Sequence, residues 1–227
     1  MLIEQTPKIF RACFPEYLTW RIPQKEKTVY LTFDDGPVPE ATHFVLELLE
    51  KHAIKATFFC VGDNVCKYPD LFKQIVKAGH QTGNHTFSHL QGFKCSTEQY
   101  MEDVEKADKV IKSRLFRPPH GQFRPSQLMK LNEKYEIVLW DVITRDYNRS
   151  LSGEYVANVV RKYTRNGSII VFHDSIKAEK NMRYALPRAI DFLIEEGYKF
   201  DVLNPQLWKK KVELISPQEC FFSKKAI

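Results

Sequence analysis

Residues 28–37 read TVYLTFDDGP, and this stretch decides which fold the chain adopts. The segment 28–32 is apolar and rich in β-branched residues, which is typical of a buried strand. Two aspartates, a glycine and a proline follow, and these residue types favour a turn. Pro39 then precedes a segment, 40–51, whose apolar residues have helical spacing. A strand, a turn and a helix in this order are the unit of a parallel α/β fold.

The same unit recurs along the chain. Further strands are predicted at 56–61, 81–85, 114–116, 137–140, 168–172 and 198–202, and further helices at 69–78, 96–111, 125–132, 154–164 and 184–195. Seven strands separated by helices predict parallel pairing with right-handed crossovers, in a barrel or in an open doubly wound sheet. We expect one domain over 27–203, an N-terminal segment (1–26) packing on it, and a C-terminal tail (204–227).

Composition excludes several classes of protein. With 227 residues, of which 43% are hydrophobic, the chain can bury one substantial core. The formal charge of +6 comes from 34 basic residues scattered among 28 acidic ones, and the densest basic run is only Lys209–Lys211. Nucleic-acid binding is therefore not expected, because it requires a clustered basic surface. The composition leaves the oligomeric state open.

The sequence predicts neither a membrane segment nor export. No run approaches the roughly 20 apolar residues that cross a bilayer. Charged residues at positions 4, 8, 11 and 16 interrupt the stretch where a signal peptide would be apolar. Five cysteines without a C-x-x-C pair fit a reducing compartment. We expect a cytoplasmic protein with no membrane partner.

Reactive side chains follow the predicted strands. The carboxyl ends of parallel strands share one face, where active sites of such folds are assembled. The candidates, each just after a different strand or at its end, are Asp34 with Asp35, His85 with His89, Arg117, Asp146 and His173. We expect them to converge in one site.

His85 and His89 predict a metal site. Their i, i+4 spacing brings two imidazoles within reach of one ion. A hydrolytic site needs a third ligand, and Asp34 and Asp35 are two candidates. Neighbouring residues leaving a strand point in different directions, so one can bind the ion while the other removes a proton from water.

Structural explanations exist for each residue taken alone. The segment 34–37 is also a good turn, His89 could be a loop residue, and Arg117 could form a surface ion pair. His173 and Asp174 could form a structural pair. Joint placement at one face favours a functional site. The remaining histidines, His43, His52 and His80, are expected to be structural.

Five motifs then resemble one family. They are TFDDGP (32–37), HTFSH (85–89), RPPHG (117–121), WDVITRDY (140–147) and IVFHD (170–174). Together they resemble the signatures of polysaccharide deacetylases of the NodB-homology type (carbohydrate esterase family 4), in family order over about 28–203. The resemblance implies a distorted (β/α)7 barrel and an enzyme that removes acetyl groups from N-acetylated amino sugars or oligosaccharides.

The resemblance also implies a metal centre. Asp35, His85 and His89 would hold a divalent metal, most often Zn²⁺, with Co²⁺ or Ni²⁺ as alternatives. Asp34 would act as general base on the attacking water, and Arg117 would pair with Asp34. Zinc-assisted hydrolysis of this kind is an established chemistry.

The remaining roles concern the leaving group and the substrate. His173 would be the general acid, oriented by Asp146, while the metal and a backbone N–H near His120 would stabilise the oxyanion. Thr86 would brace the histidine loop.

Three positions depart from the family pattern in the region expected to grip the substrate. The family usually has Tyr at position 120, often Trp at 147 and usually Leu at 171, where this chain has His120, Tyr147 and Val171. Together with Pro118, these residues are expected to line the substrate groove. Two alternatives follow: a hydrolase of the same fold that cleaves another amide or an O-acetyl ester, or an inactive carbohydrate-binding relative.

Overall fold

The protein is represented by a computed structural model that describes residues 4–204. Apart from Asn204, the predicted C-terminal tail lies outside the described residues. The strands are β1 (Thr28–Asp34), β2 (Thr57–Cys60), β3 (Gln81–Asn84), β4 (Leu115–Phe116), β5 (Glu136–Ile137), β6 (Val142–Ile143), β7 (Ile169–His173) and β8 (Lys199–Phe200). The helices are α1 (Lys8–Arg11), α2 (Pro39–Lys51), α3 (Gly62–Lys67), α4 (Pro69–Lys77), α5 (Thr97–Ile111), α6 (Pro125–Asn132), α7 (Gly153–Tyr163) and α8 (Glu179–Glu195). Within residues 4–204, no helix combines the length and the apolar character that a membrane span requires.

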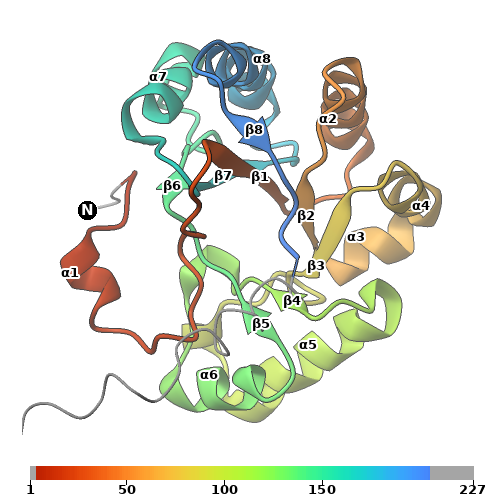
Figure 1. Ribbon diagram of the computed structural model, residues 1–227. Coiled ribbons are helices and arrows are strands. Elements are labelled where there is room, and N and C mark those ends of the chain that lie inside the picture. The colour runs from red at the N-terminus through yellow and green to blue at the C-terminus, as the bar shows by residue number, and fades with distance from the viewer. Residues whose placement is uncertain (1–3, 205–227) are drawn as a thin grey trace, which may run out of the picture.

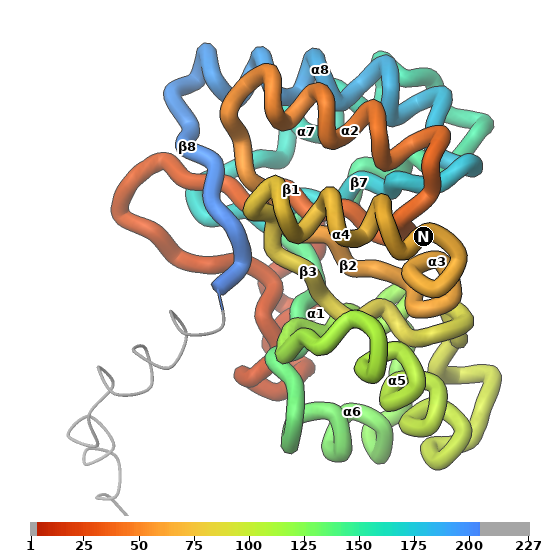
Figure 2. Tube along the Cα trace, turned by 90° about the vertical axis from the view of Figure 1, so that its right-hand side faces the viewer, coloured from red at the N-terminus to blue at the C-terminus, as the bar shows by residue number. Residues whose placement is uncertain are grey.

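The strands form one curled parallel sheet. Its order is β5-β4-β3-β2-β1-β7-β6, and β8 pairs with the beginning of β1 (Figure 1). Helices cover its outer side, with α2, α7 and α8 together on one flank and α5 and α6 on the other (Figure 2). The predicted single-domain α/β fold, a distorted (β/α)7 barrel, is confirmed.

β1 lies at the centre of this sheet. All seven of its residues are buried, as expected for a parallel strand covered on both faces. Leu31 and Phe33 belong to the largest apolar cluster, while Tyr30 belongs to a second cluster. The central strand therefore holds its carboxyl end, which carries Asp34, in a rigid frame.

Several predicted bounds were wrong. The predicted strand 137–140 ends at Ile137, because the backbone N–H of Leu139 turns to the carbonyl of Thr19 (2.7 Å), and β6 follows as an unpredicted strand. Helix α3 was not predicted, since its sequence GDNVCK has no apolar periodicity. Helix α8 begins at Glu179, before the predicted start at 184. The prediction missed this first turn because it is polar.

The N-terminal segment runs between β5 and β6, which do not pair with each other (Figure 1). Thr19 forms a parallel bridge to Val138, and Gln5 forms an antiparallel bridge to Val142. The backbone N–H of Ile143 also donates to the carbonyl of Glu4 (2.9 Å). The N-terminal segment thus bonds to the chain next to β5 and to β6, on both sides of the gap between these two strands.

A buried carboxylate anchors the same segment. Asp141 is fully buried and accepts hydrogen bonds from Arg11 of the N-terminal segment, from Arg165 (2.7 and 3.0 Å) and from Ser168 (2.7 Å). Burial alone would raise the pKa of Asp141, but these donors outweigh it and lower the pKa. The group therefore stays anionic and fixes three segments at one point.

We expect Asp141→Ala to lower the free energy of unfolding by about 3 kcal/mol, because it removes the shared acceptor of a buried charged cluster. Denaturant unfolding followed by circular dichroism measures this change. Asp70→Ala is the control, since the Asp70–Lys73 pair is exposed, and it should leave the unfolding midpoint unchanged. Equal midpoints for the wild type and Asp141→Ala would contradict the anchoring role.

Candidate active site

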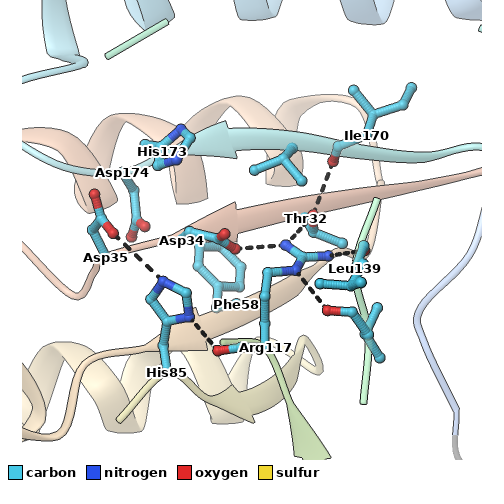
Figure 3. A network of polar contacts seen from close by, with 12 residues as sticks. Thr32, Asp34, Asp35, Phe58, His85, Arg117, Leu139, Ile170, His173 and Asp174 are labelled. Carbon is cyan, nitrogen blue, oxygen red and sulfur yellow. Dashed lines mark hydrogen bonds and ion pairs between the residues drawn. The ribbon is translucent and has the colours of Figure 1, made fainter. Parts of the chain in front are cut away.

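The predicted site residues do converge at the carboxyl ends of the strands. Asp34 ends β1 and lies in register with His173, which ends β7. His85 directly follows β3, and Arg117 directly follows β4. The parallel register therefore brings four residues from four strands to one end of the sheet (Figure 3).

The loops that carry these residues have unusual backbone geometry. Asp35, Thr86, His89 and His120 all have positive φ, at 84°, 64°, 56° and 58°. Residues other than glycine seldom adopt this left-handed region, and such conformations cluster at functional sites. The surrounding structure therefore fixes these loops tightly.

Asp35, His85 and His89 form a cluster that could hold a metal ion. One ligand atom from each lies within 4.8 Å of the others. Nε2 of His89 is 3.1 Å from Oδ1 of Asp35, and Nε2 of His85 is 3.8 Å from it. Two imidazoles and a carboxylate match the protein ligands of an open hydrolytic zinc site.

The orientation of His85 fits the same use. Its Nδ1 lies 2.7 Å from the carbonyl oxygen of Arg117, so this nitrogen carries the proton and Nε2 faces the cluster with a free lone pair. Burial lowers the pKa of His85 to about 4, although Asp34 opposes the shift. The ring is therefore neutral, as a ligand must be, throughout the physiological pH range.

Asp34 turns away from this cluster toward Arg117. The Arg117 side chain is fully buried, and its Nη1 donates to Oδ1 of Asp34 at 2.6 Å (Figure 3). Nη1 also donates to Thr32 Oγ1 (2.8 Å), and the guanidinium lies over the Phe59 ring at 4.0 Å. The surface ion pair considered for Arg117 is wrong. Thr32 is a partner that the sequence analysis missed.

His173 is paired with Asp146. Its Nδ1 lies 2.7 Å from Oδ1 of Asp146, and its backbone N–H donates to Oδ2 at 2.7 Å. Burial alone would lower the pKa of His173, but the charge and hydrogen bond of Asp146 outweigh it and raise the pKa to about 9. The imidazole is therefore protonated at neutral pH and can donate a proton from Nε2.

Asp174 has a separate role, so the predicted alternative of a His173–Asp174 pair is wrong. Its carboxyl group accepts from the Gly36 backbone N–H (3.1 Å) and from Thr42 Oγ1 (2.6 Å). A Cβ atom at position 36 would lie 1.9 Å from Oδ2 of Asp174, so only glycine fits there. Burial raises the pKa of Asp174 to about 8. This residue braces the loop that carries Asp34 and Asp35.

The histidine loop has two braces. Thr86 Oγ1 accepts from the backbone N–H of Leu90 (3.0 Å), as the sequence analysis predicts. Asp103, on α5, accepts from the backbone N–H groups of Phe87 (2.8 Å) and Ser88 (3.0 Å) and from the Ser88 hydroxyl (2.8 Å). Asp103 was missed, because a carboxylate in a polar helix gives no signal of its target.

The residues expected to bind substrate fall into two groups. His120 is exposed, with its ring 4.8 Å from that of His89, and the half-buried Tyr147 lies 4.9 Å from His173. Pro118 and Val171 are buried, and Val171 has no exposed surface. His120 and Tyr147 therefore flank the two ends of the site.

The arrangement of these side chains is typical of one class of enzyme. A ligand cluster, a carboxylate beside it and a protonated imidazole opposite are the parts that metal-assisted hydrolysis requires. The family model of polysaccharide deacetylases matches residues 21–138. The chain belongs to this family, carbohydrate esterase family 4, as its five motifs predict.

Three relatives show the extent of the similarity. A peptidoglycan-N-acetylglucosamine deacetylase of Bacillus cereus is 36% identical over 198 residues, which cover 84% of this chain and 93% of the relative. A chitooligosaccharide deacetylase of Bradyrhizobium sp. is 34% identical, covering 80% of this chain and 90% of the relative. The crystal structure of a peptidoglycan N-acetylglucosamine deacetylase in complex with a naphthalenyl N-oxidanyl-benzamide superposes with a TM-score of 0.80 at 30% identity, covering 87% of this chain and 95% of that chain.

The ligand cluster predicts metal binding. We expect the chain to bind one Zn²⁺ ion at neutral pH, and we expect His89→Ala to weaken binding by at least about 10-fold, because it removes a ligand. Isothermal titration calorimetry measures both constants. His43→Ala is the control, since His43 is exposed on α2 and should bind zinc as the wild type does. Equal affinities for His89→Ala and His43→Ala would contradict the site.

The Asp146–His173 pair predicts a titration shift. In the metal-free protein, NMR titration should place the pKa of His173 near 9, and Asp146→Asn should lower it by about one unit or more. Because this pKa lies above the value of about 6.5 in an unfolded chain, the pair stabilises the fold fully below about pH 6.5. That contribution is lost as the pH rises through about 9. A His173 pKa at or below its ordinary value would contradict the assignment.

Proposed function

We propose that this protein is a metal-dependent deacetylase that hydrolyses the N-acetyl groups of amino sugars in oligosaccharides. One observation carries the proposal: the side chains of the adjacent residues Asp34 and Asp35 face different partners. Asp35 faces His85 and His89, whereas Asp34 faces Arg117. A ligand and a base supplied from consecutive residues suit hydrolysis by an activated water.

The metal is proposed to be Zn²⁺, with Co²⁺ or Ni²⁺ as alternatives. Support comes from the neutral, oriented Nε2 of His85 beside a carboxylate and a second imidazole. When bound, such an ion acidifies water and polarises the acetyl carbonyl. Every other step falls to the side chains of this protein.

Asp34 takes the proton of the attacking water. Its carboxylate is held by Arg117, whose remaining donors bind the carbonyls of Val138 (3.2 Å) and Leu139 (3.1 Å). Because the buried guanidinium is held by four hydrogen bonds, it fixes Oδ1 of Asp34, and Oδ2 is the oxygen that accepts the proton. The water oxygen then forms its bond to the acetyl carbon.

His173 completes the reaction on the leaving group. When the carbon–nitrogen bond breaks, the amine nitrogen takes the electron pair and needs a proton, which Nε2 of His173 donates. Asp146 stabilises the imidazolium before this transfer. The products are acetate and a free amine. An amide substrate makes full use of this acid, because an amine is a poor leaving group without a proton.

The substrate class comes from the relatives. Two that resemble this chain along most of their length are named for deacetylation of peptidoglycan N-acetylglucosamine and of chitooligosaccharides. Both names describe N-acetylated amino sugars in a glycan. We propose that His120 and Tyr147 contact this sugar, because the exposed His120 lies beside His89 and the half-buried Tyr147 lies beside His173.

Acetate release from chitooligosaccharides in the presence of Zn²⁺ or Co²⁺ tests the proposal. We expect Asp34→Asn and His173→Ala each to lower kcat by about 10²- to 10⁴-fold, because each removes a proton-transfer group. His43→Ala should retain full activity, because the His43 side chain is exposed on α2 and is not part of the ligand cluster. Undiminished release by both site variants would refute the roles, and release of acetate from O-acetyl esters alone would refute the amide specificity.

A further inference from the structure

A cavity of about 270 Å³ lies beside the candidate active site, between the N-terminal segment and the barrel. Aromatic rings from both sides line it. The N-terminal segment contributes Phe10, Phe14 and Trp20, and the barrel contributes His120, Phe123 and Trp140. Clefts lined by aromatic side chains are the usual form of small-molecule binding sites.

The rings form a cluster that is only partly buried. Ring centroids lie 5.0 Å apart for Phe10 and Phe14, 5.6 Å for Phe14 and Trp20, and 6.0 Å for Phe14 and Phe123. None of these four residues is fully buried, and Phe10 is 50% exposed. Rings that served only as core would be covered on both faces, so this cluster presents flat apolar surface to the cavity.

His120 lies between the cavity and the candidate active site. This residue lines the cavity and also stacks its ring edge-on against the predicted ligand His89, 4.8 Å away. At Gly121, a Cβ atom would lie 2.8 Å from the Trp140 ring, so the absence of a side chain lets that ring approach the chain beside His120. A molecule in the cavity would therefore be separated from one held at the ligand cluster by the side chain of His120.

We propose that this cavity is a second sugar subsite, which binds a neighbouring pyranose ring of the glycan while the acetylated unit lies at the ligand cluster. The proposal rests on the proposed function. A pyranose ring has a face of C–H groups that packs on flat aromatic rings, while its hydroxyl groups remain at the rim. Because the cavity lies beside His120, we expect its occupant to be the sugar ring next to the acetylated one in the same glycan.

The dependence of deacetylation on chain length tests this subsite. For the wild type, kcat/KM should rise from the disaccharide to the hexasaccharide of N-acetylglucosamine. In Phe10→Ala and Phe10→Leu, the ratio of kcat/KM for hexasaccharide to disaccharide should fall by about 2- to 12-fold, because one stacking ring is lost. Ile9→Ala is the matched control. Ile9 precedes Phe10 in the chain, its side chain is 84% exposed, and it lies outside the cavity lining.

The outcomes separate the two proposals. Absence of acetate release from every sugar would refute the proposed function. Calorimetric binding of hexasaccharide and disaccharide to Asp34→Asn would then still test the subsite, and equal affinities would overturn it. A wild-type length ratio in both Phe10 variants would also overturn it. So would a ratio lowered in Phe10→Ala but restored in Phe10→Leu, since only apolar packing would then matter. If Phe10→Ala keeps the ratio but dissociates a dimer in sedimentation velocity, the face binds a second copy and the proposal is wrong.

Discussion

The buried ion pair between Arg117 and Asp34 is the interaction on which the site depends. It joins the end of the central strand β1 to the residue after β4, across two intervening strands. A guanidinium cannot lose its proton in a protein, so its burial requires a fixed anion and further acceptors. Thr32, Val138 and Leu139 supply three acceptors beside Asp34, so four of the five N–H donors are hydrogen-bonded. The backbone carbonyl of Arg117 also orients His85 by accepting a hydrogen bond from its Nδ1.

The backbone conformation directs the acidic side chains of the site toward different partners. Asp35 has a left-handed conformation, and this turns its carboxylate from the direction that Asp34 takes. Asp174 and Thr42 hold the loop from the opposite side. His173, on the next strand, is charged by its own partner, Asp146. Four acidic groups, Asp34, Asp35, Asp146 and Asp174, thus each have a different partner.

The sequence predicted the order of elements well where apolar runs were long, as in β1 and β7. It predicted poorly where strands have two residues, because β6 is defined by its partners and not by its own pattern. Convergence of Asp34, His85, Arg117 and His173 followed from their positions at strand ends. The braces Asp103 and Asp174 could not be predicted, since only folding brings a backbone N–H within reach of either carboxylate.

The N-terminal segment has a consequence for solubility. Strands β5 and β6 do not pair with each other, and residues 4–21 bond to the chain on both sides of the gap between them. Without that segment, each strand would present an unpaired row of N–H and C=O groups, which is a template for association with other chains. The segment therefore protects two sheet edges, and its loss would expose backbone groups that can pair with strands of other molecules.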